Sequence, residues 1–205
     1  MRRIVWRYVL LLLIGITIPG IARAALYLKL DGIDGEATAQ GHEKWIELNS
    51  FSFGVSVPSS SSGAGAGKAR FSDLVVTQLQ DSSTPKEFED LVKGTHIATG
   101  ILDLVSTSAG EPFTYFKYTF NDILLTSLGI SSGGDRPTES LSFDYGKIKL
   151  EAFNKNAMGQ ITLASMAEFD LTHPSAAPEP SAWALLTGGL LLVVARSRKL
   201  LGSRK

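Results

Sequence analysis

The chain has 205 residues, of which 44% are hydrophobic and 20% are charged, and its formal net charge at pH 7 is zero. The charge is unevenly spread: residues 25–179 hold all twenty acidic residues and eleven lysines and arginines, a net charge of −9, whereas the two ends hold nine lysines and arginines and no acid. The acidic middle argues against a nucleic-acid partner, because a protein binds nucleic acid through a basic surface. The lack of cysteine excludes disulfides, cysteine-based zinc sites and thiol nucleophiles.

Residues 1–24 have the three parts of a secretory signal peptide. Three arginines within the first seven residues precede an apolar run, residues 8–18, that is too short to be a stable membrane span. Small residues then stand where a signal peptidase requires them, so we predict cleavage after the twenty-fourth residue. The residues of the predicted cleavage site are Ala22, Ala24 and Ala25. The alternative is an uncleaved membrane anchor.

The middle of the chain, residues 25–172, is long enough for one domain with a core. Its apolar residues mostly follow β periodicity. Strands are predicted at residues 26–30, 45–57, 69–79, 96–106, 113–120, 140–152 and 161–171, with residues 123–130 continuing the strand before them. A Ser/Gly/Ala run at residues 59–67 predicts a flexible loop. In the strand 140–152, the alternation changes phase at Gly146, as a bulge would cause.

One helix is predicted between the strands, beginning at Thr84. Thr84 and Glu87 have the spacing of a capping box, with Pro85 at the first helical position. An apolar stripe at helical spacing follows, and Gly94 stands where a C-terminal cap belongs. The members of the stripe are Phe88, Leu91 and Val92. The strands and this helix predict a mainly β domain, a small antiparallel barrel or a sandwich with the helix at its side or end.

Aromatic residues crowd the predicted strand 113–120 on both of its faces. Phe113 and Tyr115 fall on one face, and the other face holds Phe116, Tyr118 and Phe120. This pattern indicates either a strand buried on both sides or a strand with one face in the core and the other in a subunit interface.

The end of the chain predicts a sorting or anchoring tail. Residues 173–181 form a linker with a Pro-Glu-Pro tripeptide, residues 182–195 form a short, uncharged transmembrane helix, and residues 196–205 form a basic cytoplasmic tail. The tripeptide is Pro178, Glu179 and Pro180, and the residues that stop transfer are Arg196, Arg198 and Lys199. This arrangement resembles the PEP-CTERM sorting signal of Gram-negative bacteria, which an exosortase recognises and processes. An ordinary single-span anchor is the alternative.

Several short segments of the middle domain occur in an order typical of one family. They are residues 28–36, 45–48, 50–54, 71–74, 94–97, 137–140 and 145–148. Together, from residue 26 to residue 152, they are similar to the Hcp family, the tube-forming protein of type VI secretion systems. The resemblance implies a small antiparallel β-barrel flanked by one helix, which assembles into hexameric rings that stack into a tube. It implies no catalytic residue and no cofactor.

The two ends depart from the family, whose members are made in the cytoplasm without a signal peptide. We therefore predict a non-enzymatic, ring-forming protein that is exported by the general secretion route and sorted at the cell envelope or released. Its predicted partners are its own copies, signal peptidase, exosortase and, before processing, the inner membrane. Two alternatives stay open: a type VI tube subunit or secreted effector, and an exported carbohydrate-binding module or enzyme on the same scaffold.

Two sets of residues are of types that occur in metal or catalytic sites. The acidic set is Asp31, Asp34 and Glu36, whose spacing does not match an EF-hand loop and suits turns between strands. The histidines are His42, His96 and His173, which are far apart and show no paired ligand spacing. We predict no metal, cofactor or catalytic site.

Overall fold

The computed structural model describes residues 24–58, 68–107 and 111–172. The chain divides into two units, residues 1–171 and residues 172–205, and the strands and the helix described below all lie in the first. Within the described ranges no helix has the length and apolarity needed to cross a membrane. The predicted signal peptide up to residue 23, the Pro-Glu-Pro linker, the apolar segment and the basic tail lie outside the described residues.

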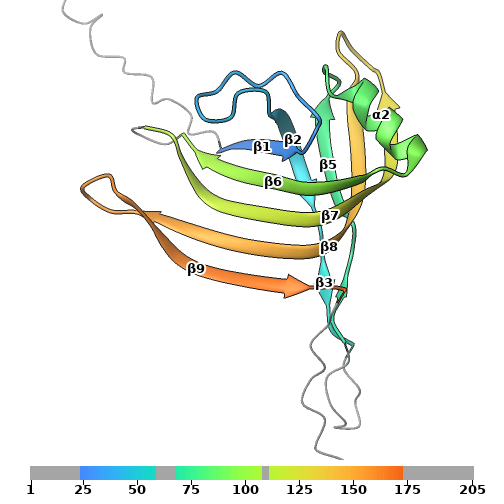
Figure 1. Ribbon diagram of the computed structural model, residues 1–205. Coiled ribbons are helices and arrows are strands. Elements are labelled where there is room, and N and C mark those ends of the chain that lie inside the picture. Colours follow the sequence, from blue (N-terminus) through green and yellow to red (C-terminus); the bar gives the residue numbers. More distant parts are fainter. Residues whose placement is uncertain (1–23, 59–67, 108–110, 173–205) are drawn as a thin grey trace, which may run out of the picture. The chain divides into compact units, whose positions relative to one another are not determined.

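Six antiparallel strands close a barrel (Figure 1). They are β1 (Ala24–Leu30), β2 (Ile46–Ser52), β5 (Leu74–Leu79), β6 (His96–Ser106), β7 (Phe113–Ser131) and β8 (Thr138–Lys155). Neighbouring strands pair in the order β5-β2-β1-β6-β7-β8, and β8 pairs again with β5 to complete the ring of hydrogen bonds. The expectation of a mainly β domain with a small antiparallel barrel and one helix is confirmed.

Alternation along the strands fills the barrel with aliphatic and aromatic side chains. On β8 Leu141, Phe143 and Tyr145 are buried, as their spacing predicts, while the residues between them face outward or are half-buried. Phe120 of β7 lies edge-on to Phe143, with ring centroids 5.5 Å apart. Full burial of such a side chain contributes about 1.5–3 kcal/mol, so these aromatic contacts are a main source of the barrel's stability.

The predicted change of phase at Gly146 is present, but a bulge does not produce it. The register of β7 against β8 is the same on both sides of this point, from Asn121 opposite Lys147 to Ile123 opposite Tyr145. The two strands change their inward face together. Asp122, which lies between the paired residues of β7, has a left-handed backbone with φ of 53°, and this local turn of the backbone accompanies the change of face.

Two of the predicted strands are each divided into two. The predicted strand 45–57 separates into β2 and β3 (Val55–Ser56), and the predicted strand 69–79 separates into β4 (Arg70–Phe71) and β5. β3 and β4 pair only with each other and form a small second sheet. The predicted loop 59–67 lies outside the described residues. In contrast, the residues from 113 to 131 form the single strand β7, as expected from a continuation.

The helix α2 (Thr84–Lys93) begins differently from the prediction. The residue that precedes it is Ser83, not Thr84, and no side chain caps the first turn. The hydroxyl of Thr84 instead donates to the carboxylate of Glu139 at 2.7 Å, and Glu87 accepts from the hydroxyl of Ser83 at 2.8 Å. The predicted capping box is therefore wrong, because both of its side chains are used in buried contacts with their neighbours.

The helix also presents its apolar residues in an unexpected direction. Phe88 and Val92 are 58% and 69% exposed, and of the predicted stripe only Leu91 packs against the core. The residues buried on α2 are polar. The end of the helix agrees with the prediction, since Gly94 has a left-handed backbone with φ of 62° and its N–H donates to the carbonyl of Leu91.

Candidate assembly surface and polar sites

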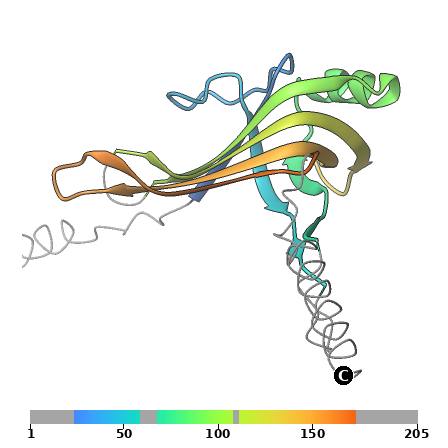
Figure 2. The same ribbon diagram turned by 60° about the horizontal axis from the view of Figure 1, so that its bottom comes forward.

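The strands β6, β7 and β8 continue beyond the barrel as a curved sheet (Figures 1 and 2). A seventh strand, β9 (Ile161–Asp170), joins this part by pairing with the second half of β8. β9 ends the sheet, so its outer edge has no strand partner among the described residues. An open edge of this kind is a template for pairing with another chain.

One face of the extended sheet is apolar and aromatic. Phe116, Tyr118 and Leu150 occupy neighbouring positions on it and are only half-buried. Tyr118 contacts Phe116 and Phe51, with ring centroids 5.0 and 5.6 Å apart. Burial raises the pKa of the Tyr118 phenol above its ordinary value. The apolar face is thus continuous with the core but is incompletely covered by the described residues.

The opposite face of the sheet carries alternating charges. Lys147 on β8 forms an ion pair with Glu168 on β9 at 3.3 Å, and Lys149 pairs with Glu151 at 2.9 Å. These groups are partly exposed, so each pair contributes only about 0–1 kcal/mol. Met166 of β9 pairs directly with Glu151, so exposed apolar side chains and charges are interspersed on this face.

The far end of the extension holds a surface hollow of about 670 Å³. Phe113, Tyr115 and Phe153 line it, and the ammonium group of Lys155 lies 5.3 Å from the centroid of the Phe113 ring. Nearby, β9 exposes large apolar side chains. These are Ile161, Leu163 and Met166, which are 51%, 53% and 57% exposed. Of the aromatic residues predicted to lie on two faces, Phe120 is in the core and the others are half-buried.

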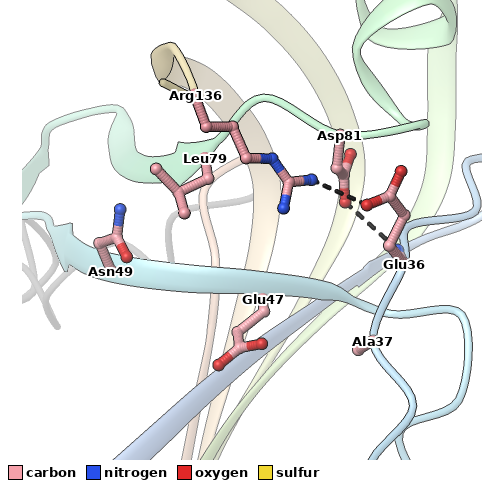
Figure 3. A pocket seen from close by; sticks show the side chains of 7 residues that line it. All are labelled: Glu36, Ala37, Glu47, Asn49, Leu79, Asp81 and Arg136. Carbon is pink, nitrogen blue, oxygen red and sulfur yellow. Dashed lines mark hydrogen bonds and ion pairs between the residues drawn. The ribbon is translucent and has the colours of Figure 1, made fainter. Parts of the chain in front are cut away.

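A polar pocket of about 250 Å³ lies beside β2, where the loops after β1, β5 and β7 meet (Figure 3). Arg136, from the loop between β7 and β8, donates to Glu36 at 2.8 Å and to the carbonyl of Gln80 at 2.7 Å. The backbone N–H of Glu36 donates to Asp81 at 3.2 Å. Glu47 completes the acidic wall. These contacts join three loops, so the pocket is a structural joint, and its carboxylates disfavour an anionic ligand.

A buried polar cluster lies where α2 meets the barrel. Gln78 of β5, Ser83, Glu87 of α2 and Glu139 of β8 are fully buried, and Thr84 is nearly so. Burial raises the pKa of Glu87 to about 8, and the hydrogen bond to Glu139 and its charge add to this shift. The sequence pattern places Glu87 in a helix cap and gives no signal for Glu139, because nothing in the local pattern brings the two together.

The acidic set lies between β1 and β2, with Asp31 in a turn and Asp34 and Glu36 in the irregular segment that follows. Asp34 pairs with Lys44 at 3.1 Å, and Glu36 pairs with Arg136. Within the described ranges, no three His, Cys, Asp or Glu side chains are grouped so that they could hold a metal ion.

Two of the three histidines contact the carboxylate of a residue in another segment of the chain. Nε2 of His42 lies 3.0 Å from Oδ2 of Asp103, a contact between residues 61 apart in the chain. Nδ1 of His96 lies 2.8 Å from Oδ1 of Asp122 on the surface. His173 lies outside the described residues. The long-range His42–Asp103 contact has no sequence signal, because its partners share no element.

Comparisons with known proteins bear on the barrel. The family model "Type VI secretion system effector, Hcp" matches residues 27–151. A solved structure of a type six secretion system protein is 28% identical, with a TM-score of 0.68, and the match covers 75% of this chain and 99% of the other. Hcp1 from Salmonella typhimurium is 25% identical, with a TM-score of 0.60 and coverage of 74% and 97%.

A type VI secretion system effector from Yersinia pestis is 21% identical, with a TM-score of 0.57 and coverage of 71% and 98%, and it shares the fold. A search of the curated proteins found no match. The family model covers more than half of the chain and agrees with the closed barrel and its single helix. This chain therefore belongs to the Hcp family of type VI secretion systems.

Proposed function

We propose that the chain is a non-enzymatic structural protein whose barrels assemble into hexameric rings. The observation that carries this proposal is the half-buried aromatic face of the sheet extension, together with the open edge of β9 and its exposed apolar side chains. A single chain leaves this surface in contact with water, at a cost of about 25 cal/mol for each Å² of apolar area. A second copy of the same extension would cover it.

The ring is tested by removing the apolar side chains of β9. In residues 25–172, Leu163→Glu combined with Ile161→Glu should convert rings to monomers, measured by light scattering and electron microscopy. Both side chains are half-exposed, so the barrel should still unfold cooperatively. Phe88→Glu combined with Val92→Glu is the matched control, since it places the same two charges on exposed sites of α2. Rings that persist in the β9 variant would remove the apolar side chains of β9 from the proposed interface.

The second part of the proposal concerns export and sorting. The paired strands run from Ala24 to Asp170, close to the two predicted boundaries of the domain. The segments before and after them carry the signal-peptide and Pro-Glu-Pro patterns. This arrangement supports export by the general secretion route and cleavage by signal peptidase. The apolar tail then holds the protein briefly in the membrane, until an exosortase processes it at the envelope.

Terminal sequencing and mass measurement of the protein in cell fractions test this part. We expect a mature N-terminus at Ala25 and a second cut near Pro178–Pro180. Replacing Glu179 by Ala should leave the protein in the membrane fraction with its tail attached. A protein that begins at Met1 in envelope material would contradict export by this route.

The family match favours a second candidate, a tube subunit or effector of a type VI apparatus. The two candidates differ in the route of export. If the second is correct, deleting residues 2–24 should leave secretion intact, whereas loss of the apparatus should abolish it. The reverse pattern supports the exported, sorted protein.

A further inference from the structure

The contact between α2 and the barrel is built around two buried glutamates. Glu87 on the helix and Glu139 on β8, here called the carboxyl pair, have no exposed surface. The helix faces the barrel with these polar groups and with Leu91, while Phe88 and Val92 point to solvent. Docking of α2 therefore depends on how the buried charge is neutralised.

The hydrogen-bond donors around the carboxyl pair are shared among too many acceptors. Nε2 of Gln78 lies 3.3–3.4 Å from four oxygens, which belong to Ser83, Glu87 and Glu139. An amide nitrogen has only two hydrogens to donate. The hydroxyl of Ser83 is within reach of Glu87 at 2.8 Å and of Asp81 at 2.5 Å, but it has one hydrogen. Oε1 of Gln78 is buried without a hydrogen-bond partner.

The charges that surround the carboxyl pair do not compensate it. Asp81, in the loop before α2, adds negative charge nearby. On the helix, Lys86 is engaged by Asp90 at 2.8 Å and lies on the partly exposed side. Arg136, in the loop between β7 and β8, is held in the polar pocket by Glu36. Among the described residues, no lysine, arginine or histidine forms an ion pair with either member of the pair.

Two ionised carboxylates in a buried site without a cation repel one another, and neither is hydrated. In such pairs one carboxyl keeps its proton at a pH where an exposed glutamate has lost it. A proton between the two glutamates supplies the missing donor, and it leaves one negative charge for Ser83, Thr84 and Gln78 to bind. The fully deprotonated state has no comparable source of stabilisation at this contact.

We propose that Glu87 and Glu139 share a single proton that latches α2 to the barrel, and that loss of this proton at alkaline pH loosens the helix. Once the proton is lost, Leu91 is the one apolar residue of the stripe that still packs α2 against the core. Because Phe88 and Val92 move with the helix, the latch also controls how these two exposed side chains are presented. The device does not depend on the proposed ring.

Infrared spectroscopy of the full-length protein tests the shared proton. At about pH 6, glutamates with ordinary pKa values are ionised, so a carbonyl band of a protonated carboxylic acid reports the pair. We expect this band in the wild type, its loss as the pH is raised to about 9.5, and its absence in Glu87→Gln. In Glu139→Gln, which keeps the burial of Glu87 but removes the second carboxyl, the band should disappear at a lower pH than in the wild type. Glu89→Gln, on the exposed side of the same helix, should retain it. A wild-type spectrum without the band at about pH 6 overturns the proposal.

Hydrogen exchange tests the latch itself. The exchange of amides in residues 84–93 is compared with that of β6 in the same sample, since intrinsic rates rise equally with pH in both. We expect the ratio of α2 to β6 exchange to rise at least about tenfold as the band disappears, which is the factor for 1.4 kcal/mol. It should stay constant in Glu87→Gln, whose amide imitates the protonated acid. A wild-type ratio that is constant across the titration shows that the proton does not hold the helix and overturns the latch.

Discussion

At the scale of single residues, burial of Glu87 makes stability depend on pH. Its pKa is raised from the ordinary value of 4.5 to about 8 in the folded state, mainly by desolvation. The folded protein therefore holds a proton that the unfolded chain releases, and the resulting stability is fully present below about pH 4.5 and is lost as the pH rises through about 8. The Glu87 carboxyl group therefore destabilises the folded protein at alkaline pH.

Glu87→Gln should remove this dependence. We expect thermal unfolding of the wild type to occur several degrees lower at about pH 9 than at about pH 6, and the variant to be nearly constant and more stable at the higher pH. Differential scanning calorimetry at both pH values measures this. Glu47→Gln, at an exposed position of β2, should keep the wild-type slope. If Glu87→Gln kept that slope as well, another group would be responsible.

A glycine at a close backbone approach gives a second prediction at this scale. A Cβ built on Gly35 would lie 2.4 Å from the carbonyl oxygen of Trp45 and 2.8 Å from Cα of Ile46. These are backbone atoms, so no side-chain rotation relieves the clash. Gly35→Ala should destabilise the barrel by about 1–3 kcal/mol in urea unfolding. Gly133→Ala is the control, because no heavy atom lies within 4 Å of its Cβ, and equal effects of the two would contradict this reasoning.

At the scale of elements, the start of α2 shows how a local signal is overridden by a tertiary contact. Thr84→Ala should cost about 1–3 kcal/mol, because it removes a buried hydrogen bond to a carboxyl group and not because it removes a cap. Thr84→Ser keeps the hydroxyl and should restore most of this stability in chemical denaturation. A serine variant as unstable as the alanine variant would assign the loss to the methyl group of the threonine instead.

Strands could be predicted from the sequence where one face of the strand is buried and the other is exposed to solvent. Leu141, Phe143 and Tyr145 alternate with polar residues, and they form the buried side of β8 as expected. The helix boundaries were nearly correct because Gly94 and the Pro85 region are strong local signals. The orientation of α2 was not predictable, because the apolar spacing of Phe88 and Val92 suggests a buried face.

The polar sites could not be read from the sequence, because their members come together only when the barrel closes. Glu139 lies 55 residues from Thr84, which donates to it. Asp103 lies 61 residues from His42, and each contact joins a strand to a residue outside the strands, Thr84 on α2 and His42 in the loop before β2. The aromatic residues of β7 were identified as candidates for two faces, and the structure separates Phe120 in the core from the half-buried remainder. Periodicity predicts a face but not which element covers it.

At the scale of the whole molecule, the charge of the domain opposes the assembly that its apolar surface favours. Residues 25–172 carry nineteen acidic and eleven basic residues, a net charge of −8. Six copies in one ring would bring together a net charge of about −48. At physiological ionic strength, salt screens such repulsion beyond about 8 Å. Salt strengthens the attraction between apolar surfaces only at much higher concentrations. Electrostatics should therefore decide when rings form.

We expect residues 25–172 to be monomeric at low salt and to form rings as sodium chloride approaches the physiological range. The proposed interface is apolar, so screening removes the repulsion without weakening the attraction. Stacking of rings brings like-charged faces together again and should need more salt than ring closure does. Light scattering across a salt series, with electron microscopy of each state, measures both steps. Replacing three exposed glutamates outside the extension by glutamine should lower the salt needed for rings, whereas only monomers at every salt and protein concentration would remove the ring and leave the fold.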